Sequence, residues 1–291
     1  MSVQDRHYID LQFTENFSEL RVHYDEELQA IWAYMRGSPR PCFTPTLLKE
    51  IIGLNTRVRL MGGIKYVIGA SDVPQVYNLG GDLNLFFQYI QEGKREKLRQ
   101  YAYDCVECGY SNATQINHGI TTISLVQGSA LGGGFEGALS SNVVVVEENA
   151  KLGFPEILFN LFPGMGAYTF LSRRMSVNQV EKMVLSGEQY SGADLYEMGA
   201  VDMLAKEGEG EKVVREYIAG HRAQRRARIA IHQARNRVNP ITIEELRDIA
   251  DIWVEAAMDI NEASLRVMER LVRAQDRKLA TKKLVASAAN A

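Results

Sequence analysis

Two glutamates, Glu136 and Glu156, are the residues of this 291-residue chain best suited to acid–base chemistry. Glu136 follows a run of three glycines (132–134), and Glu156 follows a Gly-Phe-Pro turn (153–155). The glycine run comes after an apolar segment, residues 120–126, that reads as a buried strand. Because glycine has no Cβ, the backbone N–H groups of such a turn can approach a ligand closely. Two carboxylates and backbone donors around one small volume would form an acid–base site.

A second glycine turn, Gly80-Gly81-Asp82, follows a short predicted strand at residues 76–79. An oxyanion hole needs two N–H donors that converge from separate loops, and Gly81 and Gly133 are suitably placed to provide one each. Taken singly, Glu136 reads as an acid at a helix N-terminus and Glu156 as an exposed turn residue. Together with both turns, they favour a catalytic interpretation.

The glycine run also permits a dinucleotide-binding interpretation, because Gly132, Gly134 and Gly137 satisfy G-x-G-x-x-G after a strand. That fold needs a long helix after the glycines and an acidic residue at the end of the next strand. Here the predicted helix (134–141) has barely two turns, and the next strand (143–147) ends too early. We therefore disfavour a nucleotide site.

The elements that must position these turns alternate between strands and helices. Residues 9–36 have the period of strands, and residues 44–61 read as a helix opened by Pro45. The remaining predicted elements are strands at 64–70 and 76–79, a helical segment at 82–109, and the strand–helix–strand series from 120 to 147. Two strands per helix indicate a mixed α/β fold with a winding sheet.

The last third of the chain reads differently. No strand is predicted after residue 207, and Pro240 separates two long helices, the second opening with the capping-box pattern Thr242-x-x-Glu245. We predict an α/β core at residues 1–207 and a helical extension at 208–291. The extension would serve oligomerisation and pocket closure.

Composition excludes several classes of protein. Apolar residues make up 46% and charged residues 24%, as in ordinary soluble globular proteins, and the net charge of −3 argues against nucleic-acid binding. We find no signal-peptide pattern and no stretch able to span a bilayer, so a cytoplasmic location is expected. Three cysteines cannot form a disulfide framework, and Cys105-x-x-Cys108 and the five histidines lack the spacing of a metal site. We expect no metal and no cofactor.

Five segments resemble the crotonase superfamily of enoyl-CoA hydratases and isomerases. They are YNLGGDL (77–83), QGSALGGGFE (127–136), LGFPE (152–156), LSG (185–187) and ADLYEMGAVD (193–202). The resemblance implies a spiral of ββα turns, with C-terminal helices that trimerise, often as a dimer of trimers. It also implies oxyanion donors at Gly81 and Gly133 and catalytic glutamates at Glu136 and Glu156.

Three longer segments are similar to diffusible signal factor synthases: GGDLNLF (80–86), FEGALSSN (135–142) and PEILFNLFPGMGAY (155–168). The similarity implies dehydration of a 3-hydroxyacyl chain on acyl carrier protein, followed by hydrolysis to a free cis-2-unsaturated fatty-acid quorum signal. A sensor kinase is a further implied partner, and a role mainly in binding such a partner stays an alternative. Another is an ordinary enoyl-CoA hydratase or isomerase.

In the implied dehydration, a thioester α-proton is too weak an acid for a free carboxylate, so the enolate must be stabilised by the Gly81 and Gly133 donors. We assign Glu156 as the base at Cα and Glu136 as the acid that protonates the departing β-hydroxyl. The sequence leaves an exchange of these roles open, because close carboxylates titrate as a pair.

Apolar residues after Glu156 and in the last helix are candidates for an acyl tunnel, with ordinary core packing as the alternative. They are Phe159, Leu161, Phe162, Met165, Trp253 and Leu271.

Residues 221–237 hold six arginines and no acid, which indicates either a solvated helix face or a docking site for the acidic carrier protein. We name Arg222, Arg225 and Arg226 for the docking role.

Overall fold

The strands form two sheets in the computed structural model, which describes residues 17–271 and 273. The larger sheet has the order β1-β2-β3-β5-β7-β10, and the smaller has the order β4-β6-β8-β9. Neighbours are parallel except at β1/β2 and β8/β9. The bounds are β1 (Leu20–Asp25), β2 (Ala30–Met35), β3 (Tyr66–Ser71), β4 (Val76–Asn78), β5 (Thr121–Val126), β6 (Ser129–Leu131), β7 (Val143–Glu147), β8 (Lys151–Gly153), β9 (Gln189–Ser191) and β10 (Met203–Ala205).

The chain winds between these sheets in repeated turns. After β3, β5 and β7 it leaves the larger sheet, adds a short strand to the smaller one (β4, β6, β8) and then turns into a helical segment. This is the predicted spiral of ββα turns. The predicted strand residues before residue 17 lie outside the described part of the chain.

Helices cover the sheets and fill the space between the turns. They are α2 (Pro45–Met61), α3 (Leu83–Gln91), α4 (Arg95–Ala113), α5 (Gly133–Leu139), α6 (Ala167–Leu171), α7 (Val177–Ser186), α8 (Gly192–Glu197), α9 (Gly210–His221), α10 (Arg225–Val238) and α11 (Ile243–Met258), with 3₁₀ segments η1 (Thr114–His118) and η2 (Pro155–Phe159).

Two of the predicted helical stretches are divided. The segment predicted as one helix at 82–109 is α3 and α4, separated at Gly93, which has φ +63°. The first long helix before Pro240 is likewise two helices, α9 and α10. The second, α11, ends at Met258, and helical residues resume at residue 262. Glycine's freedom to adopt positive φ explains the break at Gly93, which a general helix-favouring composition does not reveal.

Only one of the two hydrogen bonds of the predicted capping box is formed among the described residues. Thr242 Oγ1 accepts a hydrogen bond from the Glu245 N–H at 3.1 Å. The Glu245 carboxylate instead binds Thr169 Oγ1 at 2.8 Å and the guanidinium of Arg173. It therefore ties the start of α11 to α6.

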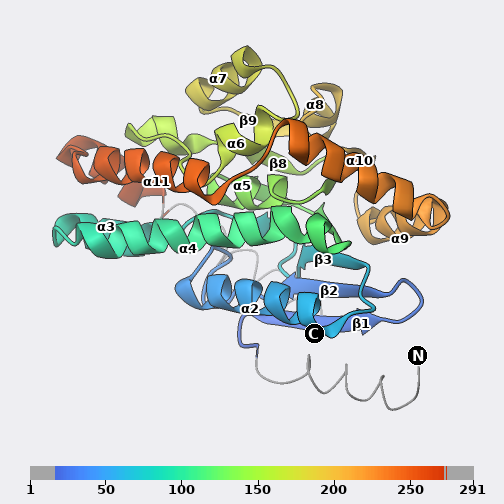
Figure 1. The fold of residues 1–291 in the computed structure, drawn as a ribbon. Coiled ribbons are helices and arrows are strands. Elements are labelled where there is room, and N and C mark those ends of the chain that lie inside the picture. Colours follow the sequence, from blue (N-terminus) through green and yellow to red (C-terminus); the bar gives the residue numbers. More distant parts are fainter. Residues whose placement is uncertain (1–16, 272, 274–291) are drawn as a thin grey trace, which may run out of the picture.

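Two helices after residue 207, α9 and α11, pack onto the core. Along β2, Ile31, Ala33 and Met35 join the apolar layer with α2 and α4, while Trp32 and Tyr34 face the side covered by α9. On the α2 side, α11 lies along α4, as Figure 1 shows. The extension thus completes both faces of the larger sheet, and its residues 272 and 274–291 lie outside the described part.

Within the described residues, no helix is both long and apolar enough to cross a membrane. The His, Cys, Asp and Glu side chains of that same part form no cluster that could hold a metal ion. All three cysteines are free thiols.

Candidate active site

The two glycine turns are in direct contact. A Cβ built on Gly80, where φ is +99°, would lie 2.8 Å from the Leu131 carbonyl oxygen and 3.2 Å from the Gly133 nitrogen. A Cβ on Gly134 would lie 2.0 Å from the Asn78 carbonyl oxygen. The approach of the two backbones therefore requires glycine on both sides.

Gly81 and Gly133 bring two unpaired N–H donors to one place. The Cβ position of Gly133 is only 3.3 Å from the Gly81 nitrogen. In the described residues, neither N–H donates to a backbone carbonyl, and both glycines line the same cavity. Two free donors from separate loops are what an oxyanion hole requires.

The Gly81 turn is fixed from several sides. The Gly80 N–H donates to Asn78 Oδ1 at 2.8 Å, and the Phe43 N–H donates to the Gly80 carbonyl at 2.8 Å. The Tyr101 hydroxyl, on α4, accepts from the Asp82 N–H at 3.1 Å and donates to the Phe43 carbonyl. These bonds hold the first donor in place before any ligand arrives.

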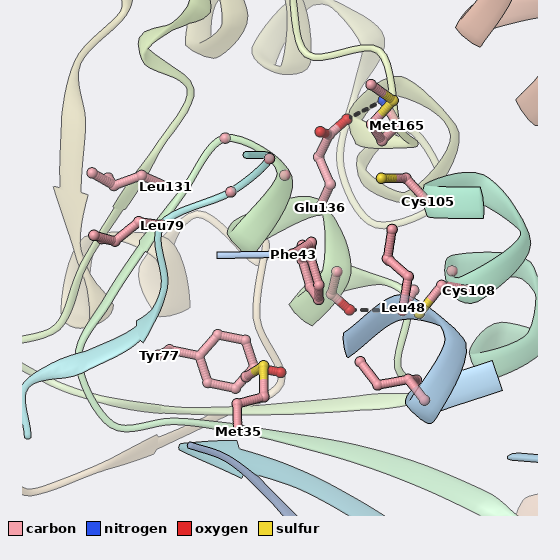
Figure 2. Close-up of a pocket in the computed structure, with 18 of the residues that line it drawn as sticks. Met35, Phe43, Leu48, Tyr77, Leu79, Cys105, Cys108, Leu131, Glu136 and Met165 are labelled. Carbon is pink, nitrogen blue, oxygen red and sulfur yellow. Dashed lines mark hydrogen bonds between the residues drawn. The ribbon is translucent and has the colours of Figure 1, made fainter. Parts of the chain in front are cut away.

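Glu136 lies in the first turn of α5 with a side chain that is 2% exposed. Its Oε1 accepts the N–H of Met165 at 2.8 Å and of Ala167 at 2.9 Å, and Figure 2 shows the first of these bonds. Burial raises the pKa of Glu136 to about 7, and the backbone N–H donors oppose part of that rise.

Glu156, in η2, lies against the second glycine turn. A Cβ on Gly132 would sit 2.2 Å from Glu156 Oε1, so only glycine leaves room for this carboxyl group. Its Oε2 is buried and has no hydrogen-bond partner among the described residues. Burial first, and then the charge of Glu136, raises the pKa of Glu156 to about 8.

The two carboxyl groups therefore differ in their preferred charge. Glu136 has two N–H donors that stabilise its ionised form, whereas Glu156 Oε2 has none. When the pair holds one proton, that proton resides mainly on Glu156.

A cavity of about 280 Å³ joins these groups. Of the six residues predicted for a tunnel, Phe159, Met165, Trp253 and Leu271 line it. Leu161 is buried in the core and Phe162 packs against the core, and neither is part of the lining. The turn at Asn160, where φ is +59°, separates Phe159 from these two residues.

Much of the lining comes from residues that the sequence did not mark as part of a site. Strand β2, helix α2 and helix α4 contribute most of these residues: Ala33, Met35, Leu48, Ile51, Leu54, Asn55, Cys105, Cys108, Gly109 and Asn112. They carry no motif, because their role comes from the packing of α2 and α4 over the sheet. The only local signal was the apolar stripe of α2.

The arginines named for docking lie away from this cavity. Arg222 donates to the Glu27 carbonyl at 2.8 Å, and the half-buried Arg225 donates to the Gly119 carbonyl. Arg226 is exposed and forms no hydrogen bond or ion pair within the described residues. Two of the three thus tie the α9–α10 connection to neighbouring loops.

Comparison with known proteins gives a consistent family. The model of the Enoyl-CoA hydratase/isomerase family matches residues 38–256. The chain is 43% identical over 79 residues to the 2,3-dehydroadipyl-CoA hydratase of Escherichia coli, covering 27% of this chain and 31% of that enzyme. It is 25% identical over 175 residues to the fatty acid oxidation complex subunit alpha of Pseudomonas aeruginosa, covering 58% of this chain and 23% of the subunit. The matched part is a third or less of these curated relatives.

Solved structures share the fold at low identity. An enoyl-CoA hydratase from Bacillus halodurans superposes with a TM-score of 0.75 at 17% identity, over 87% of this chain and 100% of that one. Pseudomonas aeruginosa DspI gives a TM-score of 0.64 at 18% identity, over 91% and 96% of the two chains. The predicted crotonase-like fold is confirmed.

Proposed function

Because the chain belongs to the enoyl-CoA hydratase/isomerase family, we propose that it adds water to, or removes water from, the C2–C3 bond of an acyl thioester. The observation that carries this proposal is the unequal bonding of two carboxyl groups beside two free N–H donors. Addition of water needs one ionised and one protonated carboxyl group in the same site, and this pair provides them near neutral pH.

The oxyanion donors would act on the thioester oxygen. As water adds to C3, electron density moves onto that oxygen, where the N–H groups of Gly81 and Gly133 stabilise the enolate. Removing one such donor typically costs about 3–4 kcal/mol of transition-state stabilisation.

The glutamates would carry the protons. Ionised Glu136 takes a proton from water as the oxygen bonds to C3, and protonated Glu156 then delivers its proton to C2. In the reverse direction Glu156 removes the C2 proton and Glu136 protonates the leaving hydroxyl, as assigned from the sequence. The preferred position of the shared proton, on Glu156, is the one that hydration needs.

A direct assay tests the proposal. The protein is incubated with a trans-2-enoyl thioester and, separately, with a 3-hydroxyacyl thioester, and products are followed by ultraviolet absorbance and mass spectrometry. We expect interconversion of the two, and loss of it in Glu136→Gln and Glu156→Gln variants that remain folded. Wild-type rates in either variant would contradict the proposed pair.

The signal synthase predicted from the sequence is the second candidate. In this case dehydration to a cis-2-enoyl thioester precedes its hydrolysis to the free acid. The segment GGDLNLF (80–86), which is similar to such synthases, favours it, because helix α3 begins two residues after Gly81 and places Leu83 and Phe86 on the cavity. Release of free cis-2-enoic acid from 3-hydroxyacyl carrier protein would support this candidate. If trans-enoyl thioester were the only product, the hydratase function would be favoured instead.

The same assay examines the carrier protein as partner. Arg226→Glu should raise the apparent KM for a carrier-bound substrate and leave a small soluble thioester unaffected, with Lys182→Glu, exposed on α7 and outside the arginine run, as the control. Equal effects on both substrates would contradict docking at this arginine.

A further inference from the structure

The catalytic cavity has an exposed end and a buried end. Two of its lining residues are exposed to solvent: Leu158, at 54%, and Gln189. Asn55 and Ser124 are each 2% exposed, and Ser124 is hydrogen-bonded to Tyr77, which lies on the side of the cavity opposite Glu136. Figure 2 shows Glu136 and Met165 at one side of the cavity, Tyr77 and Met35 at the opposite side, and Phe43 between them. A substrate entering past Leu158 would reach the glutamates first and extend its acyl chain toward Tyr77.

The buried end is polar. Ser124 Oγ and Ser141 Oγ lie 2.8 Å apart, and the Tyr77 hydroxyl donates to Ser124 Oγ at 3.2 Å. The Asn112 amide donates to both Ser140 Oγ and Ser141 Oγ at 2.9 Å. These residues all line the cavity. A pocket made only for a hydrocarbon tail would not place a hydroxyl network at its floor.

Asn55 adds a donor without a partner. Its Nδ2 atom is buried and makes no hydrogen bond to the described residues, although the side chain lines the cavity. Its backbone carbonyl accepts from Gln115 Nε2 at 3.0 Å and from Arg59 Nε at 3.2 Å, which fixes this part of α2. An unpaired buried amide donor is costly unless a ligand acceptor reaches it.

The floor carries no positive charge. Among the described residues that line the cavity there is no lysine, arginine or histidine. A distal carboxylate on the substrate would therefore be buried without a cation, whereas a hydroxyl or ketone needs only hydrogen bonds.

The length of the cavity determines how far from the thioester a hydroxyl or ketone of the substrate would have to lie to reach the floor. On α4, Asn112 at the floor lies seven positions after Cys105, which is near Glu136, and seven positions span about 10 Å at the rise of an α-helix. At roughly 1.3 Å of extended chain per carbon–carbon bond, that length holds about six to eight carbons beyond the reacting ones.

We propose that the acyl chain of the substrate carries a neutral oxygen, a hydroxyl or ketone, near its distal end, where Asn55 and the hydroxyls of Tyr77, Ser124 and Ser141 receive it. This rests on the proposed function for the thioester at the other end of the same cavity, and it names the class of substrate.

A turnover experiment compares matched substrates. Pairs of 2-enoyl thioesters of about nine to eleven carbons, with and without a terminal hydroxyl, are assayed at each length. We expect at least about tenfold higher kcat/KM for the hydroxylated member, a ratio equal to about 1.4 kcal/mol. A terminal carboxylate should be the poorest substrate.

Substitutions at the floor test whether these residues cause the preference for the hydroxylated substrate. Asn55→Leu, similar in shape but without the donor, should remove the preference or reverse it, and Ser124→Ala provides a second variant should the first fail to fold. Leu48→Met, which changes an apolar lining residue, should keep it. If the wild type and both floor variants showed the same preference for the hydroxylated substrate, the inference would be overturned. The polar groups of the floor would then bind only water.

A binding experiment separates this inference from the proposed function. Saturated pantetheine thioethers with and without the terminal hydroxyl cannot react, and their affinities are measured by calorimetry on the wild type and on Asn55→Leu. If the wild type binds the hydroxylated analogue more tightly than the plain one and Asn55→Leu does not, the proposed binding of a distal oxygen at the floor is supported, even if no thioester is turned over. Turnover of thioesters with tighter binding of the plain analogue, or no binding of either, overturns it.

Discussion

Glu136 and Glu156 face the same cavity, but within the described residues only Glu136 accepts hydrogen bonds from the backbone of another segment. Two N–H groups, of Met165 just before α6 and of Ala167 at its start, donate to Glu136 Oε1, so this carboxyl group can be ionised in a buried position. Burial and the neighbouring charge of Glu136 both disfavour ionisation of Glu156, and no described residue donates a hydrogen bond to its Oε2. The pair thus supplies a base and an acid without any movement of either residue.

The pH dependence of hydration should follow from this difference. The active form has Glu136 ionised, with a pKa of about 7, and Glu156 protonated, with a pKa of about 8. We expect kcat/KM to rise through the first value and to fall above the second, which gives a narrow bell in a profile measured from about pH 5 to about pH 10. A plateau extending well above the second value would contradict this assignment of roles.

The raised pKa of Glu136 also affects folding stability. Between the ordinary value of 4.5 and about 7 the folded state binds more protons than the unfolded state, so the free energy of unfolding falls as pH rises through that window. The full difference corresponds to roughly 3 kcal/mol. Glu136→Gln should flatten this fall in urea titrations and be more stable than wild type above it. The exposed Glu181→Gln serves as control, and an unchanged slope in Glu136→Gln would exclude Glu136 as the cause.

Helix α4 connects the oxyanion turn to the rest of the fold. Near its start, the Tyr101 hydroxyl bridges Asp82, in the Gly81 turn, and Phe43, in the segment before α2. Two residues later, the Tyr103 hydroxyl donates to Asp251 Oδ2 of α11 at 2.9 Å. One tyrosine therefore positions the donor turn, and the other holds a covering helix.

Tyr101→Phe and Tyr103→Phe are a matched pair for this difference. Loss of the Tyr101 hydroxyl should lower kcat roughly tenfold, with little change in KM, because the Gly81 N–H is less well aligned for the transition state. Tyr103→Phe should lower the free energy of unfolding by about 1 kcal/mol and leave kcat near wild type. Equal kcat in the two variants would remove the positioning role from Tyr101.

The same helix shows why sequence reaches only part of the site. Gly81, Gly133, Glu136 and Glu156 could be named as candidates from the sequence, because each lies in or directly after a short turn whose residue types are dictated by its local geometry. Asn55 and Tyr101 were not, because their roles arise where α2 and α4 pack against turns far away in the chain. Leu161 lies in the core and outside the cavity lining for a related reason: the turn at Asn160 redirects the chain, and apolar character alone does not say which surface a residue faces.

Across the whole molecule, the helices after residue 207 are covered unequally. Helix α9 is buried against the larger sheet and α11 against α4, but α10 has no buried residue. Ile231 and Val238 on α10 are 67% and 87% exposed. A basic helix with exposed aliphatic side chains is suited to contact a further surface.

We propose that this surface is a second copy of the chain, in the homotrimer or dimer of trimers that the sequence resemblance implies. A closed ring repeats one contact at every subunit, so a single charge on α10 enters each interface. Ile231→Glu should therefore shift the mass measured by sedimentation equilibrium from trimer or hexamer toward monomer at micromolar concentration. Leu60→Glu is the control, since Leu60 is 82% exposed on α2 and should leave the mass unchanged. A monomeric wild type would exclude the contact, and the same assembly in both variants would place it elsewhere. Dissociation in Ile231→Glu alone would assign α10 to the interface.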